Sequence, residues 1–196
     1  MQNKALPYQP LVQALRSLTN IDEIKIAVPS IWIGELTRLL PELKSSTHEE
    51  LTYQPVEPGE ARLRLFEALV QVFLGLTKTN GPLVLCIDDL HLADNTTLDW
   101  LVYLSKRILQ SHLLVLAAYR SEDNDAVVDV KIALNHAGVL FEVKLQGLNN
   151  YATQEIVSHF LDSDQKMGNF SERLQQSTKG NPFLIIETLR TLKESG

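Results

Sequence analysis

The chain has 196 residues, of which 44% are hydrophobic and 21% charged, the composition of an ordinary globular protein. Its 24 acidic side chains outnumber the 18 of Lys and Arg, and the net charge of −6 argues against direct contact with nucleic acid through a basic face. Because no apolar run approaches the ~20 residues that cross a bilayer, we expect no membrane contact.

The only cysteine, Cys86, lies inside an apolar run and cannot form an internal disulfide. Free cysteines are most often buried, so we predict that Cys86 is a small core residue. The first ten residues lack the apolar core of a signal peptide. We therefore expect a cytoplasmic protein, in which thiols stay reduced.

The first third of the chain predicts short helices with irregular joins. Six of the eight prolines fall within the first 58 residues, and proline breaks helix interiors and central strands. We predict helices over residues 10–18 and 31–40, followed by a polar loop over residues 44–50.

From residue 60 the pattern changes to alternating helices and strands. The apolar run that opens "LVLCIDDLHLAD" at Leu83 predicts a strand buried on both faces, as in a parallel sheet covered by helices. The order of elements implies right-handed crossovers and an α/β fold, with a parallel sheet flanked by helices. The other predicted elements are helices over 60–76, 96–109 and 124–138, and strands over 112–120 and 139–145.

After residue 145 only helical patterns follow. They cover residues 149–161, 169–177 and 182–194, and Pro182 suits the first turn of the last helix. We place the domain boundary between 146 and 149. The predicted organisation is an α/β core over residues 1–147 with a proline-rich helical start, and a small helical lid over residues 148–196.

Charged residues follow both predicted strands of the central region. Asp88 and Asp89 end the first strand, and Arg120 ends the second. Ligands of parallel α/β sheets bind beyond the carboxyl ends of the strands. One carboxylate could hold Mg²⁺ through water while the other activates an attacking water, and an arginine could stabilise a terminal phosphate. Alternatively, the two acids cap the helix that starts near Asn95, or pair with a surface lysine.

Three blocks in order resemble a known family: "LVLCIDDLHLADNTTLDWLVYL", "LLVLAAYRSED" and "STKGNPFLIIETLR". They are similar to the ATPase module of the STAND class, AAA-related P-loop ATPases found in SARP-like and LuxR-like bacterial transcriptional regulators. The segment "LPYQPLVQALRSL" adds to the likeness. The resemblance implies part of a nucleotide-dependent switch in a multidomain signalling or transcriptional regulator. The implied cofactors are ATP and Mg²⁺, and the implied partners are the DNA-binding or effector domains of the parent chain.

The resemblance also implies roles for individual residues. Asp88 matches the Walker B aspartate that positions Mg²⁺, Asp89 matches the water-activating acid, and Arg120 matches the sensor arginine. A lid motif that packs near the nucleotide base is matched by Gly180, Asn181 and Pro182.

The sequence departs from that pattern in several respects, and two of them bear on phosphate binding. Ala118 replaces a threonine common in the family, and no G-x-x-x-x-G-K-[ST] loop occurs in the 196 residues. We therefore expect a fragment that begins after the P-loop, with ATP hydrolysis in the full-length parent and neither hydrolysis nor tight nucleotide binding by this chain alone. The alternative function is a non-catalytic regulatory or interaction scaffold that does not bind nucleotide by itself.

Two further expectations concern assembly and metal binding. In the family the P-loop strand lies between the strand ending at Arg120 and the strand over 139–145, so its absence predicts exposed strand edges and a homodimer or a rearranged sheet. His91 and Asp94 have a spacing that a metal could bridge, but a zinc site needs further ligands and none lies near in the sequence.

Overall fold

The fold is seen in a computed structural model that describes residues 7–18, 20–44, 57–120, 125–161 and 168–194. The chain forms two compact units, Met1–Leu140 and Phe141–Gly196. Our expected polar loop over residues 44–50 lies, apart from Lys44, outside the described residues.

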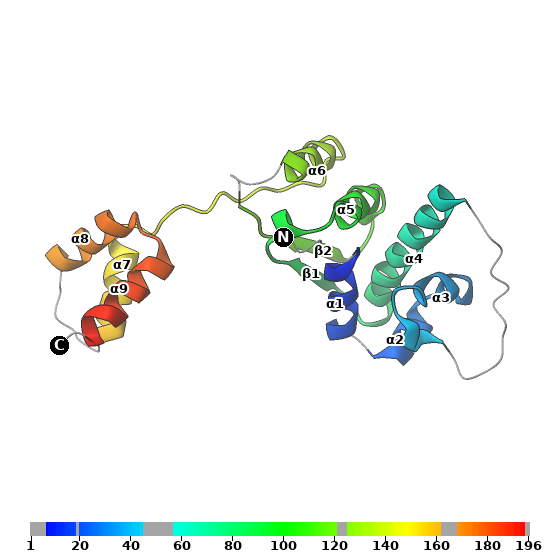
Figure 1. The fold of residues 1–196 in the computed structure, drawn as a ribbon, viewed down its shortest axis with the longest axis horizontal. Coiled ribbons are helices and arrows are strands. Elements are labelled where there is room, and N and C mark those ends of the chain that lie inside the picture. Colours follow the sequence, from blue (N-terminus) through cyan, green and yellow to red (C-terminus); the bar gives the residue numbers. More distant parts are fainter. Residues whose placement is uncertain (1–6, 19, 45–56, 121–124, 162–167, 195–196) are drawn as a thin grey trace. The chain divides into compact units, whose positions relative to one another are not determined.

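The N-terminal unit begins with short helices, as the proline distribution predicts. The helix predicted over 31–40 ends earlier, because Leu40 precedes Pro41 and adopts a non-helical backbone with φ −125° and ψ 77°. One helix was missed although its signal is present: the Asn20 side chain accepts a hydrogen bond from the N–H of Glu23 and so caps it. The elements are α1 (Gln9–Leu18), α2 (Ile21–Ala27), α3 (Ser30–Leu36), the 3-10 turn η1 (Pro41–Leu43) and α4 (Pro58–Thr79) (Figure 1).

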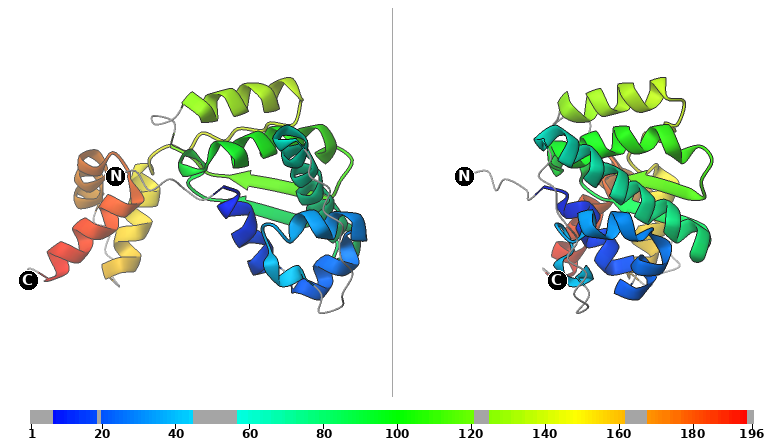
Figure 2. Two further views of the ribbon diagram at one scale, coloured as in Figure 1. Left: turned by 45° about the vertical axis from the view of Figure 1, so that its right-hand side comes forward. Right: turned by 90° about the vertical axis from the view of Figure 1, so that its right-hand side faces the viewer.

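The central part of this unit is a parallel pair of strands with helical crossovers. Strand β1 (Leu83–Ile87) pairs with β2 (Leu113–Ala117), with Leu83 opposite Leu113 and Ile87 opposite Ala117. Figure 2 shows the two arrows side by side and pointing the same way. This arrangement confirms the α/β class, a parallel sheet flanked by helices. The remaining elements are η2 (Leu90–Leu92), α5 (Asn95–Ile108) and α6 (Asp125–His136), with α5 lying between α6 and the strands.

The prediction that β1 is buried on both faces is wrong. Side chains alternate along both strands, and only the row containing Leu85 and Leu113 belongs to the core shared with α4 and α5. The side chains of the other row, which we call the open face, are exposed. The open face consists of Val84 (47% exposed), Cys86, Leu114 (59%) and Leu116 (60%). The predicted core position of Cys86 is therefore also wrong.

The strand predicted over residues 139–145 is not formed. Val139 donates its N–H to the carbonyl of Leu134, as part of the turn that closes α6 at Gly138 (φ +69°). The residues that follow, 140–149, form neither a helix nor a strand. Alternating hydrophobicity creates a strand only where a neighbouring strand supplies hydrogen-bond partners. Within the described part of the chain, β2 has β1 as its single partner strand.

Aromatic packing joins α4 and α5 at the centre of the core. Trp100 is fully buried, its ring lies 5.4 Å from that of Phe73, and its indole N–H donates to the carbonyl of Phe66 at 3.2 Å. Helix α2 packs so closely on α4 that a Cβ built on Gly75 would lie 2.1 Å from the carbonyl oxygen of Ala27. The helix α4 that carries these contacts thus holds the long N-terminal segment against the sheet.

The C-terminal unit is helical in its described part, as predicted. Its small core is formed by Val157, Leu174, Ile185 and Leu189. The helices are α7 (Asn150–Leu161), α8 (Gly168–Thr178) and α9 (Pro182–Glu194).

Candidate functional site

The two aspartates sit on a sharp turn directly after β1. Asp89 has a left-handed backbone (φ 48°, ψ 44°), which aspartate tolerates better than most residues. Its N–H donates to the Oδ1 of Asp88 at 2.8 Å. The turn thereby fixes one oxygen of Asp88 and leaves both carboxylates exposed to solvent.

His91 links this turn to the segment that follows β2. Its Nε2 lies 3.8 Å from Oδ1 of Asp89, and its Nδ1 accepts the backbone N–H of Arg120 at 3.4 Å. An accepting Nδ1 carries no proton, so in the neutral ring Nε2 is the protonated nitrogen and faces the carboxylate. The histidine side chain is 7% exposed. His91 therefore has a local hydrogen-bonding role.

Backbone hydrogen bonds hold the two strand ends together. Ala118 donates its N–H to the carbonyl of Ile87 at 2.9 Å and accepts the N–H of Leu90 at 2.8 Å. The parallel pairing thus continues one step beyond β2 and encloses the Asp88–Asp89 turn. The structure brings Asp88, Asp89 and Arg120 to the same edge of the sheet.

Asp94 has a structural role that the sequence analysis missed. Its Oδ1 accepts the N–H of Thr97 at 3.0 Å and so caps α5, and its Oδ2 accepts the N–H of Tyr8 at 3.2 Å. The sequence signal for this role was an aspartate directly before the start of α5, three residues before Thr97, whose N–H it caps. Because Asp94 caps this helix, the alternative that Asp88 or Asp89 does so is wrong.

The predicted lid residues form the turn between α8 and α9 in the C-terminal unit. Gly180 has φ +70° and a Cβ there would lie 2.2 Å from the carbonyl oxygen of Leu148, so only glycine fits. The Asn181 side chain accepts the N–H of Phe183 at 3.0 Å, and Pro182 starts α9. Local structure thus explains all three residues, and their contact with a nucleotide base stays a prediction.

The side-chain donors at the turn after β1 are carboxylates, which suit hard cations such as Mg²⁺. In the described part of the chain, no three His, Cys, Asp or Glu side chains are placed to hold an ion. Two exposed neighbouring carboxylates do fit Mg²⁺, which keeps several water ligands and commonly uses one or two carboxylates together with substrate phosphates. Asp88, with one oxygen already engaged, would supply such a carboxylate.

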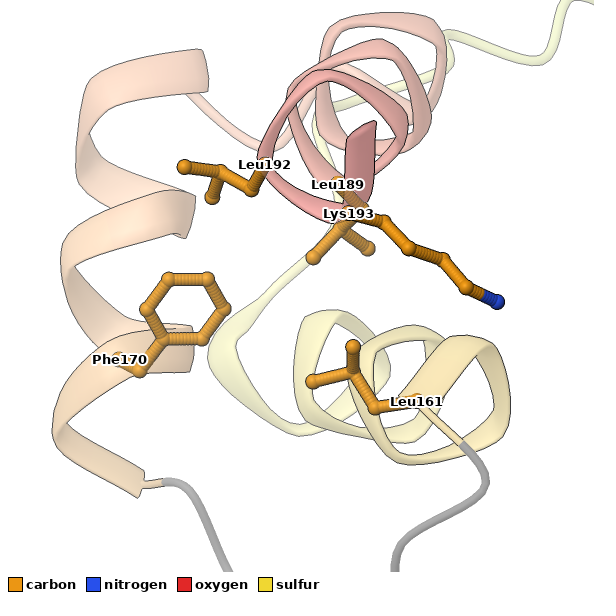
Figure 3. A pocket seen from close by; sticks show the side chains of 5 residues that line it. All are labelled: Leu161, Phe170, Leu189, Leu192 and Lys193. Atoms are coloured by element: carbon orange, nitrogen blue, oxygen red, sulfur yellow. The ribbon is translucent and has the colours of Figure 1, made fainter. Parts of the chain in front are cut away.

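A separate apolar cavity lies within the C-terminal unit. Its volume is about 440 Å³, and Leu161, Phe170, Leu189, Leu192 and Lys193 line it. Figure 3 shows the apolar side chains gathered around it, and the Lys193 ammonium lies 5.5 Å from the Phe160 ring centroid. The lining carries no set of convergent hydrogen-bond donors for phosphates, so this cavity is not the candidate nucleotide site.

Comparison with known proteins decides the family. Residues 2–116, more than half of the chain, match the family described as AAA ATPase domain. The chain belongs to this family. The match covers the elements from α1 into β2 and includes Asp88 and Asp89, whereas Arg120 and the turn at Gly180 lie beyond it.

Two other comparisons gave no match, one with curated proteins and one with solved structures. As for the membrane, none of the helices that the structure describes combines the length and apolar character needed to span one.

Proposed function

We propose that this AAA ATPase domain is part of a STAND-class nucleotide-dependent switch in a multidomain signalling or transcriptional regulator. In this proposal, the sheet edge at the carboxyl ends of β1 and β2 binds Mg²⁺ and activates the attacking water. The observation that carries the proposal is the turn after β1. Asp88 and Asp89 are exposed there at the carboxyl end of a parallel strand, in hydrogen-bonded connection with the segment bearing Arg120.

The two acids have different tasks in this proposal. Asp88 would hold Mg²⁺, which would neutralise charge on the phosphates, and Asp89, oriented by His91, would accept a proton from the attacking water. The Arg120 guanidinium stabilises charge on the terminal phosphate. The triphosphate would come from ATP. The G-x-x-x-x-G-K-[ST] loop, whose backbone N–H groups bind phosphates, does not occur in these 196 residues.

The test uses a longer protein that joins this chain to such a loop. We expect Asp88→Asn to weaken Mg²⁺-dependent binding of a fluorescent ATP analogue by about tenfold or more. Asp89→Asn should retain binding and lower hydrolysis by about a hundredfold or more. Asp129→Asn, which changes an exposed aspartate on α6, is the matched control and should alter neither. Unchanged Mg²⁺-dependent binding in the Asp88 variant would refute the assignment.

A second candidate function is an interaction scaffold that does not bind nucleotide by itself. Ala118 supports it, because that residue joins the strand ends through its backbone alone and has no hydroxyl to orient a phosphate. The open face supports it as well. A measurement on the 196-residue chain itself distinguishes the two candidate functions. A rise in its melting temperature with micromolar Mg²⁺–ATP would contradict the scaffold function.

A further inference from the structure

The turn between α4 and β1 contains the only Asn-Gly pair of the 196 residues, Asn80 and Gly81. In such a pair the backbone nitrogen of the glycine can attack the side-chain carbonyl carbon of the asparagine, because no Cβ on the glycine shields that nitrogen. The attack closes a five-membered succinimide ring and expels the side-chain nitrogen as ammonia. Water then opens the ring to aspartate or isoaspartate.

Both reacting groups are accessible in the folded chain. Asn80 is exposed, and a Cβ built on Gly81 would meet nothing within 4 Å. Among the residues that the structure describes, none accepts a hydrogen bond from the Gly81 N–H. The Gly81 nitrogen can therefore lose its proton and attack without first giving up a hydrogen bond within the protein.

The surroundings of Asn80 nevertheless hold it in an unreactive geometry. Its ψ of −7° eclipses the Gly81 nitrogen with the backbone nitrogen of Asn80 and not with its Cβ, so the ring cannot close without rotation. The side-chain nitrogen donates to Oε2 of Glu23 at 3.1 Å, and the side-chain oxygen accepts from the hydroxyl of Thr79 at 2.6 Å. These hydrogen bonds restrain the rotation that the reaction requires.

We propose that Asn80 is deamidated spontaneously in the folded chain, at a rate that its contact with Glu23 restrains, and that the product loosens α2 from the end of α4. Conversion replaces the amide donor by a carboxylate opposite the carboxylate of Glu23, so a hydrogen bond becomes a repulsion between like charges. Isoaspartate also lengthens the backbone by one carbon atom, shortly before β1 begins at Leu83. The change is irreversible, because the ammonia is lost.

The first experiment follows the full chain at neutral pH by peptide mapping with mass spectrometry, both folded and in urea. We expect the peptide that contains Asn80 to gain about one dalton, at a rate about tenfold lower in the folded chain than in urea. Asn80→Gln should abolish this gain. A folded chain without any gain when the unfolded chain is fully converted overturns the proposal, and equal rates in the two states refute the restraint.

Two neighbouring acids in the first turn of α2 provide a matched pair of variants. Glu23→Ala releases the side-chain amide of Asn80 and should raise the deamidation rate of the folded chain by about threefold or more. Asp22→Ala removes an exposed acid from the same turn and should leave the rate unchanged. In urea all three chains should react alike. Equal rates in the two folded variants would contradict a restraint by Glu23.

The consequence for α2 is tested with Asn80→Asp, which reproduces the aspartate product. We expect amides of α2 to exchange with deuterium about twofold faster or more, because like charges now oppose each other at the contact. Adding Glu23→Gln should restore the slower exchange, since the glutamine amide can donate to the new carboxylate. Circular dichroism verifies that each variant is folded. Unchanged exchange of the α2 amides in folded Asn80→Asp would contradict the loosening of α2.

Discussion

The carboxylate of Asp94 accepts a hydrogen bond from the backbone N–H of Tyr8, which lies 86 residues earlier in the chain. The same carboxylate caps α5 through the N–H of Thr97. One side chain thus fixes both the start of the crossover helix and the entry of α1, where Tyr8 is buried with a left-handed backbone (φ 62°). This contact anchors the N-terminal segment next to the turn that carries Asp88 and Asp89.

Replacing Asp94 should therefore cost more than a helix cap alone. Asp94→Ala removes the cap and leaves the Tyr8 N–H without its acceptor, and we expect a loss of about 2 kcal/mol in the free energy of unfolding. Asp99→Ala on the same helix removes only the exposed ion pair with Arg62 and should cost less than about 1 kcal/mol. Urea unfolding measures both, and equal losses would contradict the anchoring role.

A second prediction concerns the pH dependence of stability through Glu67. Burial raises the pKa of this carboxyl, but hydrogen bonds from Gln71 and Tyr103 and the charge of Arg107 outweigh it and lower the pKa below 4.5. Because the folded pKa is the lower one, the ionised carboxylate stabilises the fold above about pH 4.5, and this contribution is lost as the pH falls through the folded value.

Glu67→Gln should lower the free energy of unfolding at neutral pH by about 1–3 kcal/mol, because it weakens hydrogen bonds to a charged group. The difference from the unmodified chain should shrink as the pH falls towards about 3. Glu60→Gln, which affects an exposed pair with Arg64, is the control and should show little difference at either pH. Thermal melts across this pH range provide the measurement, and a constant difference would refute the explanation.

The contact between α2 and α4 yields a third prediction. Gly75→Ala would place a methyl group 2.1 Å from the carbonyl oxygen of Ala27, so the helices must separate, and we expect a loss of about 1–3 kcal/mol. Gly59→Ala, in the first turn of the same helix, meets nothing within 4 Å and should be neutral or stabilising by up to about 1 kcal/mol. Chemical denaturation measures the free energy of unfolding of both variants. Similar values would show that the close contact between α2 and α4 does not cause the loss of stability.

The link through His91 gives a fourth prediction. His91→Ala removes the acceptor of the Arg120 N–H, so we expect that amide to exchange with deuterium about tenfold faster. Leu92→Ala changes a neighbouring side chain that is 67% exposed and should leave the exchange rate unchanged. NMR-detected hydrogen exchange resolves the single amide. An unaltered rate in the His91 variant would mean that the histidine does not hold the segment after β2.

Sequence reasoning succeeded where a local pattern has one structural meaning. Helix α4 follows from its long apolar periodicity, and α9 was placed at its observed ends because Pro182 suits a helix start. The parallel pairing of β1 and β2 follows from two short apolar runs separated by a helix, and it explains why the acids and the arginine meet at one edge.

Burial and strand pairing could not be read from the sequence, because they depend on which other elements are present. Cys86 and Val84 lie in a fully apolar run, yet they are exposed, because the core shared with α4 and α5 covers only the other row of side chains. Residues 139–145 have the alternation of a strand but no described neighbour to pair with. The sequence by itself determined most of the helices, the two paired strands and the order of the charged residues. Only the tertiary structure decided which faces are covered and which strand edges are paired, since hydrogen bonds and burial between distant segments require those segments to meet in space.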